Sequence, residues 1–301
     1  MMGRCGCREL NSTLGVPMLT RKLSLLLLVT LVALGSGARA DDAEMVKEKL
    51  FQAKKAYDAE VQKFRKSVAD HLDKREDDAR KTGNKKLVDQ VKAERERFEK
   101  SGELPTTCPQ TLLTQMAAAR GALDKAYTAA VKEFVKIKED AAAEATEKEQ
   151  LKHATEAALL FGKRTSLAVL KPTEVKVWNT FFDKNKTFTV DGSPVPRSIL
   201  MHPDKNGEGL VSFALAGKAT AFRATIGIPT YTNPQYSPAS PVTFEVLGDG
   251  KSLWKFEPVV KLDDLQPCTV NVAKVQKLTL RVTCKDHGWA HCVWLAPIVA
   301  E

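Results

Sequence analysis

The spacing of hydrophobic residues changes once along this chain, and each spacing demands a different kind of packing. Residues 41–100 contain no proline, and Gly83 is their only glycine. Apolar residues there recur every three, four or seven positions, at Leu50, Tyr57, Val61, Phe64, Val68 and Leu72. Such spacing gathers side chains on one face of an α-helix. The sequence therefore predicts a long helix whose apolar seam needs a partner, as in a coiled coil.

A second seam supplies that partner. Its apolar residues are Leu112, Met116, Ala119, Leu123, Ala126, Ala130, Phe134 and Ile137. The stretch 101–105, which contains glycine and proline, ends the first helix, and Thr82-Gly83-Asn84 predicts a bend within it. A last short helix is expected over 151–161. We therefore predict an antiparallel helical hairpin, coiled-coil-like, over residues 41–165.

After Gly162 the apolar residues alternate with polar ones, which is the period of a β-strand. Segments that show this alternation are 211–215, 222–226, 242–246 and 278–282. Turn signals such as Asn206-Gly207 and Asp249-Gly250 separate them. About nine short strands are typical of an antiparallel sandwich. The predicted fold class is α+β in separate domains, with a β-sandwich over residues 167–301.

The first forty residues have the organisation of an export signal. Arg21 and Lys22 precede an apolar run over 23–34, and Ala38-Arg39-Ala40 follows. A basic segment, an apolar stretch of about 7–15 residues and an A-x-A site are typical of a secretory signal peptide. The run is shorter than the roughly 20 residues of a membrane-spanning helix. We expect residues 1–40 to be cleaved, which directs the protein outside the cell or to the periplasm or envelope, with no transmembrane segment left.

Charge and motifs exclude two broad function classes. The net charge is +9, but residues 1–40 account for +4 of it. Residues 41–164 carry only +2 and residues 165–301 only +3, so both segments are nearly balanced. Without a basic stripe, we expect no nucleic-acid partner. The sequence contains no G-x-S-x-G, no H-E-x-x-H and no phosphate-binding glycine loop. We therefore predict a protein that is not an enzyme.

Four cysteines follow the signal segment, and three lie within the last 34 residues. Exported proteins meet an oxidising compartment, so we expect one local disulfide among Cys268, Cys284 and Cys292. Its pairing is open, with Cys284–Cys292 and Cys268–Cys284 favoured, and Cys108 is expected to be free. The run from Cys284 through His287 and His291 also holds ligand types that zinc accepts. A disulfide or separate buried side chains explain the same residues, so no metal site is predicted.

The C-terminal segments together resemble a known family. The similar pieces are Ile199–Pro203, Val211–Lys218, Phe222–Ile228, Val242–Val246, Asp249–Trp254 and Asp286–Ala290. In this order they are similar to the NPCBM/NEW2 family of carbohydrate-binding modules, over residues 167–301. The resemblance implies a jelly-roll sandwich of the galactose-binding type, which recognises sugars through loops at one end. Members of that family often accompany glycoside hydrolase domains.

The resemblance also implies a calcium ion in some relatives, but this chain departs from their closing motif. It reads Asp286-His287-Gly288-Trp289-Ala290-His291, one residue shorter before the tryptophan, with His291 in place of an acidic residue. Both changes remove the oxygen ligands that calcium prefers. We therefore expect no cofactor, and calcium is the alternative left open.

Two loops carry the candidate ligand-binding residues. Trp289, flanked by His287, His291 and Asp286, offers an aromatic face on which a sugar ring can stack. A long proline-rich loop over 229–241 holds Tyr231, Asn233 and Tyr236, types suited to polyol recognition. On strands, Trp254 and Trp294 are expected to fill the core instead.

The sequence thus predicts an exported, non-catalytic protein that binds a glycan or polysaccharide, with the helices as a spacer or a means of self-association. Two alternatives remain at this point. One is a structural or protein-interaction role in the cell envelope, and the other is a subunit that targets a partner glycoside hydrolase.

Overall fold

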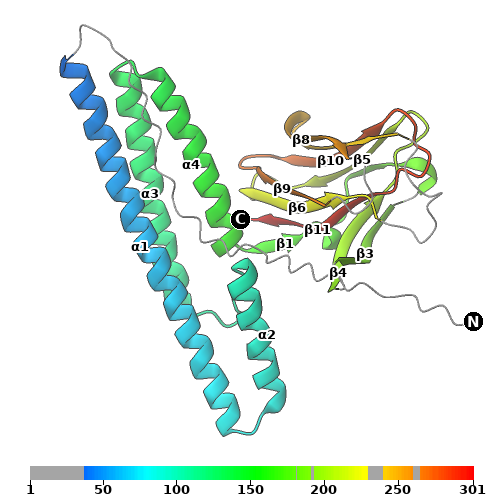
Figure 1. Cartoon of the computed structure of the whole chain (residues 1–301), viewed down its shortest axis with the longest axis horizontal. Helices are drawn as coiled ribbons and strands as arrows, with labels where there is room; N and C mark the ends of the chain where they lie inside the picture. Colours follow the sequence, from blue (N-terminus) through cyan, green and yellow to red (C-terminus); the bar gives the residue numbers. More distant parts are fainter. Residues whose placement is uncertain (1–36, 181, 191–192, 230–239, 260–264) are drawn as a thin grey trace, which may run out of the picture. The chain divides into compact units, whose positions relative to one another are not determined.

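The computed structural model describes residues 37–301 except 181, 191–192, 230–239 and 260–264. Four helices come first, and two antiparallel sheets follow (Figure 1). The helices are α1 (Gly37–Lys81), α2 (Lys85–Ser101), α3 (Gln110–Lys136) and α4 (Asp140–Phe161). The predicted order, helices followed by an antiparallel β-sandwich, is therefore confirmed.

The predicted bend after α1 is a reversal of the chain. Gly83 has a φ of 67°, a left-handed conformation that glycine adopts without steric cost. The Asn84 side chain then accepts a hydrogen bond from the Leu87 amide at 3.1 Å and caps α2. As a result α2 runs back along the end of α1 instead of continuing its direction.

A second reversal divides the other half of the predicted hairpin. Lys138 has a φ of 64°, and the Glu139 amide donates to the Phe134 carbonyl at 2.8 Å. This turn ends α3 and lets α4 fold back beside it, although alanines and other strong helix formers follow. The hairpin is thus four helices, and sequence periodicity alone does not reveal where the chain turns.

The predicted seams form the core of the helical part. One cluster joins Leu50 of α1 to Leu123, Tyr127 and Phe134 of α3. Another is built from Phe64, Val68, Leu72, Val91 and Met116, which bring together α1, α2 and α3. Both seams are therefore buried where helix periodicity places them.

The strands form two sheets with a shared core. The first sheet has the order β3 (Phe182–Val190), β4 (Ser193–Met201), β11 (Cys292–Ala300), β6 (Ala221–Gly227) and β9 (Gln266–Asn271), with β1 (Arg164–Ser166) also on β11. The second has the order β2 (Glu174–Lys176), β5 (Glu208–Ala214), β10 (Lys277–Cys284), β7 (Val242–Gly248) and β8 (Lys251–Val259). Two short 3-10 helices, η1 (Leu167–Val169) and η2 (Trp178–Thr180), lie between the first strands. All pairings among the described strands are antiparallel, as predicted.

The helical part joins the sandwich at one defined end. Arg164 of β1 pairs with Ala300 of β11, only three residues after α4 ends at Phe161. Leu159 packs with Ala221 and Ala300 at the same end. The other end of β11, at Cys292, is eight residues along the strand, or roughly 25 Å away. Loops at the Cys292 end are therefore remote from the helical connection.

The predicted disulfide is not present. Cys108, Cys268, Cys284 and Cys292 are all free thiols in the structure. Cys268 and Cys292 lie on β9 and β11, and β6 separates these strands, so the two backbones stand about 10 Å apart, beyond the reach of a disulfide. Cys284 ends β10 in the other sheet. Burial, followed by the charge of Cys284, raises the pKa of the Cys292 thiol, so these two favoured partners lie near each other as free thiols.

A buried ion pair fixes α2 against α1. Arg75 Nη1 donates to Glu94 Oε2 at 2.5 Å, and the Glu94 side chain is only 2% exposed. Thr106 and Gln90 also donate to the Glu94 carboxylate, at 2.7 and 3.1 Å. These hydrogen bonds hold the pKa of Glu94 below its usual value although burial opposes them.

Removing Arg75 should destabilise the helical part. Arg75→Met keeps an apolar stem but leaves a carboxylate buried without its cation, which costs about 3 kcal/mol. Chemical denaturation followed by circular dichroism measures the change. The control is Arg80→Met, because Arg80 pairs with Glu76 on the surface of the same helix and should lose less than about 1 kcal/mol. Equal losses in the two variants would contradict this account.

Candidate functional site

Three connections emerge at the end of the sandwich that is remote from the helices. Pairing places Cys292 opposite Met201, Val293 opposite Gly227, and Cys284 opposite Val242. The segments 202–207, 228–229, 240–241 and 285–291 therefore leave the sheets at one end. The candidate site is built on these segments.

The loop over 285–291 is held by its own hydrogen bonds. Asp286 Oδ1 accepts from the Gly288 amide at 2.9 Å, an Asx turn. The Ala290 amide donates to the His287 carbonyl at 3.1 Å, and the His291 amide to the Trp289 carbonyl at 2.8 Å. The Asp286 carboxylate thus braces the loop, and the ligand contact predicted for it stays a prediction.

Trp289 is presented outward by this loop. Its φ is 56°, a left-handed conformation that is uncommon for a bulky residue. Its side chain is 46% exposed, although most large hydrophobic side chains of the described residues are buried. The His291 ring stands edge-on to the indole, with centroids 5.9 Å apart.

Ser240 ties a second loop to the first. Its hydroxyl donates to the Asp286 carbonyl at 3.0 Å and accepts from the Asp286 amide at 2.9 Å. Ser240 directly follows residues 230–239, so the end of the predicted proline-rich loop meets the loop that carries Trp289. Tyr231, Asn233 and Tyr236 themselves lie outside the described residues.

His202, at the start of the third connection, is the centre of the site. It is 4% exposed, and its Nδ1 lies 2.6 Å from the Pro203 carbonyl oxygen. A carbonyl only accepts, so Nδ1 carries the proton. This geometry gives His202 a structural hydrogen-bonding role.

Aromatic rings from two segments, η2 and the 285–291 loop, surround His202. Its ring centroid is 5.3 Å from His291, 5.7 Å from His287 and 5.4 Å from Trp178. Trp178, in η2, is also tied by its amide to the His202 carbonyl at 3.1 Å. We call His202, His287, His291, Trp178 and Trp289 the ring cluster.

Burial keeps two of these histidines neutral. Desolvation, followed by the charge of nearby His202, lowers the pKa of His291 to about 4. Desolvation also lowers the pKa of His202, although its bond to Pro203 opposes this. Each neutral imidazole has one donor and one acceptor nitrogen, and in His202 the donor, Nδ1, already bonds the Pro203 carbonyl.

Beside the ring cluster, the backbone at Gly207 closely approaches the backbone at Cys284. Gly207 has a φ of 77°, and a Cβ there would lie 2.1 Å from the Cys284 carbonyl oxygen. The Cys284 amide donates to the Gly207 carbonyl at 2.8 Å. The Asn206-Gly207 turn signal therefore marks the contact that brings the His202 connection beside the start of the 285–291 loop.

The structure sorts the predicted residues into three groups. His287, Trp289 and His291 meet in one cluster, while Asp286 braces the loop. Trp294 is fully buried beside Phe222 and Phe244, as the strand pattern predicted, whereas Trp254 stacks on Phe256 and is only partly buried against the core. Trp178 was missed, because it lies between strands in sequence and nothing nearby marks it as a partner of His202.

Neither a metal centre nor a membrane helix is found in the described ranges. Within them, no three His, Cys, Asp or Glu residues are grouped so as to hold a metal ion. Burial and the charge of Asp286 raise the pKa of Cys284 to about 11, which disfavours the thiolate that zinc requires. No helix there is long and apolar enough to span a bilayer.

Comparison with known proteins places this site in a recognisable domain. Residues 163–299 match the family model of the NPCBM/NEW2 domain, as the sequence resemblance predicted. No curated protein matches the chain.

Solved structures similar to 46% of this chain include carbohydrate-binding modules of two bacteria. One holds CBM51-2, in complex with GlcNAc, and INT domains of Clostridium perfringens ZmpB, at 17% identity and a TM-score of 0.38. Another holds the tandem CBM51 modules of a Streptococcus pneumoniae family 98 glycoside hydrolase, at 18% and 0.38. A third is CBM51 from Clostridium perfringens GH95 with methyl-galactose, at 17% and 0.35. The match covers 32%, 46% and 100% of these chains, respectively, so it spans about a third of the first.

The depressed pKa of His291 predicts a loss of stability in acid. The unfolded chain binds this proton below about pH 6.5, whereas the folded chain resists it until about pH 4. The contribution of His291 is therefore fully present above pH 6.5 and declines as the pH falls toward 4. Thermal unfolding at pH 7 and at pH 4.5 should show a smaller difference in Tm for His291→Gln than for the parent. His71→Gln, outside the ring cluster, is the control and should keep the parental difference.

Proposed function

We propose that this protein binds a glycan at the end of its β-sandwich, with Trp289 as the stacking platform. The observation that carries the proposal is an exposed indole fixed by a braced loop beside neutral imidazoles. An aromatic surface suits the CH face of a sugar ring, and the imidazole of His287, in the same loop, adds a polar group that can bond its hydroxyls. The NPCBM/NEW2 match supports a ligand of the carbohydrate class.

The strained backbone of Trp289 supports a role in binding. A left-handed bulky residue costs about 1–3 kcal/mol, and such strain gathers at ligand sites. An exposed indole also forgoes the free energy of burial. Both costs are consistent with a side chain selected for contact with a ligand. The Asx turn of Asp286 holds the loop that carries Trp289 in this conformation.

The outer face of the five-stranded sheet is a poorer platform. Ser212 and Thr279 bond each other at 2.8 Å there, and Arg281 pairs with both Glu245 and Glu208. These polar groups satisfy one another across β5, β10 and β7, so a sugar would have to displace them. The end loops are therefore the better site.

The remaining parts of the proposal concern context. Residues 1–40 act as an export signal, and the mature chain acts outside the cytoplasm without catalysing a reaction. The helical part acts as a spacer, because it joins the sandwich at the end remote from Trp289. Recognition through a few loop residues predicts modest affinity for a single site.

A glycan array probed with the chain from Asp41 to Glu301 tests the proposal. We expect the parent to bind at least one glycan and Trp289→Ala to bind it at least about tenfold more weakly, the loss of about 1.4 kcal/mol. Phe51→Ala on α1 is the matched control, because Phe51 is also an exposed aromatic, 49% against 46%, and should leave binding unchanged.

Two results would contradict parts of this proposal. Undiminished binding by Trp289→Ala would move the site, with Tyr231 and Tyr236 the next residues to replace. A folded chain that binds no glycan would overturn glycan recognition and favour a protein-interaction role in the envelope.

A further inference from the structure

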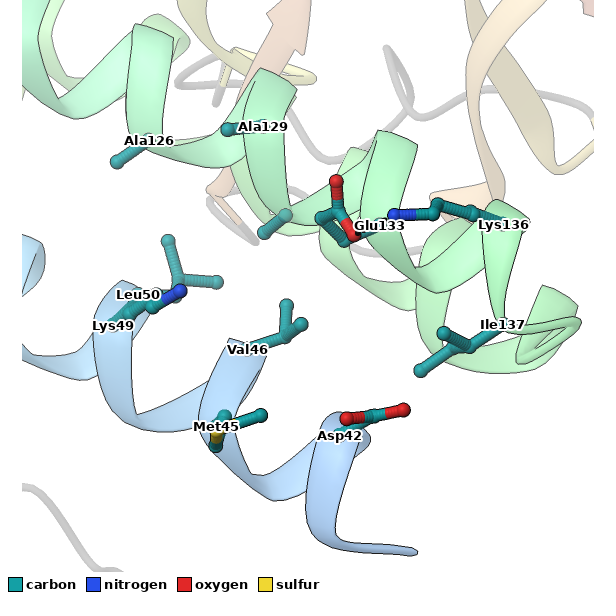
Figure 2. Close-up of a pocket in the computed structure, with 11 residues that line it drawn as sticks. Asp42, Met45, Val46, Lys49, Leu50, Ala126, Ala129, Glu133, Lys136 and Ile137 are labelled. Atoms are coloured by element: carbon teal, nitrogen blue, oxygen red, sulfur yellow. Dashed lines mark hydrogen bonds and ion pairs between the residues drawn. The ribbon is translucent and has the colours of Figure 1, made fainter. Parts of the chain in front are cut away.

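A groove with an apolar floor runs between the first turns of α1 and the end of α3 (Figure 2). Its volume is about 500 Å³. Every residue that lines it belongs to α1 or α3, or is Ile137 directly after α3. Met45 and Val46 lie on the α1 side of the groove. On the α3 side, small side chains such as Ala129 leave the space open (Figure 2).

The groove exposes apolar surface to solvent. Met45 is 54% exposed beside Val46, which packs against the core that contains Leu50 and Phe134. The groove therefore continues the hydrophobic core out to the surface. An additional helix laid along it would extend that core by one layer.

The charges along α1 specify what kind of helix fits. Asp42 and Lys49 both line the groove, carry opposite charges and stand seven residues, or two turns, apart. Met45 and Val46 are the two central residues between them. In an antiparallel pair of identical helices centred there, each Asp42 meets the other copy's Lys49, and Met45 meets Val46.

The α3 rim is compatible with that arrangement. It carries Glu133 and Lys136, whose side chains form an ion pair at 3.3 Å. Together with Asp42 and Lys49, the rim holds two positive and two negative charges, so two copies of it do not repel. A self-complementary patch of this kind is what a two-fold dimer requires.

We infer that the groove is a self-association face, occupied by α1 of a second copy of this chain in antiparallel orientation. The two-fold axis passes between Met45 and Val46, and the Asp42–Lys49 pairs flank it on both sides. This inference is independent of glycan binding, since the groove is built from the helices and Trp289 belongs to the sandwich.

Sedimentation equilibrium on the chain from Asp41 to Glu301 tests the inference through charge reversal. We expect the parent to dimerise. Asp42→Lys and Lys49→Asp each place like charges opposite one another, so each should weaken dimerisation at least about tenfold. The double variant restores opposite charges and should dimerise within about threefold of the parent.

The control is a matched pair on the other side of the same turns. Glu44 and Lys47 form an exposed ion pair at 3.4 Å and do not line the groove. Glu44→Lys and Lys47→Glu should therefore leave the dimer unchanged, and circular dichroism should show parental helicity in all five variants.

Each contrary result overturns a defined part of the inference. A monomeric parent at every concentration would exclude self-association and leave the groove to a different protein. A dimer insensitive to Asp42→Lys and Lys49→Asp would place the interface elsewhere. Failure of the double variant to recover would exclude the antiparallel Asp42–Lys49 pairing.

Discussion

The packing of β11 at the centre of the sandwich is the constraint on which the rest of the protein depends. This strand pairs with β1, β4 and β6, and its Trp294 fills the core between the sheets beside Phe222 and Phe244. Burying an indole of this size favours a single arrangement of the surrounding strands. Because Cys292 begins the strand and Ala300 ends it, the same element positions both the ring cluster and the junction with the helices.

The ring cluster shows how packing within the sandwich fixes the positions of the proposed binding residues. His202 is buried and bonded to Pro203, so it does not depend on a ligand for its position. The rings of His291 and His287, in the 285–291 loop, pack against His202, and Trp289 remains exposed to solvent. A rigid base with one exposed aromatic limits the ordering that binding would require, which favours affinity from a small contact area.

The spacing of apolar residues in the sequence predicted much of this structure. The period of three to four predicted the seam from Leu50 to Leu72, and the period of two predicted strands such as β5 and β10, because each follows directly from which side chains need burial. The reversal at Lys138 was missed, since a lysine in a left-handed turn has no distinctive sequence mark. Trp178 was missed for a related reason, because its contact with His202 joins residues 24 positions apart through η2 and the end of β4. The disulfide expected among the last three cysteines is not formed in the structure, although Cys284 lies close enough to Cys292 to add to the rise that burial causes in the pKa of that thiol.

The pairing of β1 with the last residues of β11 has a mechanical consequence. The chain enters the sandwich from α4 at Arg164 and runs along β11 from Ala300 toward Ile298. If a ligand held the Cys292 end while the helices were pulled, tension would act along these strands. The β1–β11 hydrogen bonds, with the Glu301 amide on the Lys163 carbonyl, would then share the load in shear instead of breaking one after another. A protein tethered in this way would resist detachment by flow better than its small area of contact suggests.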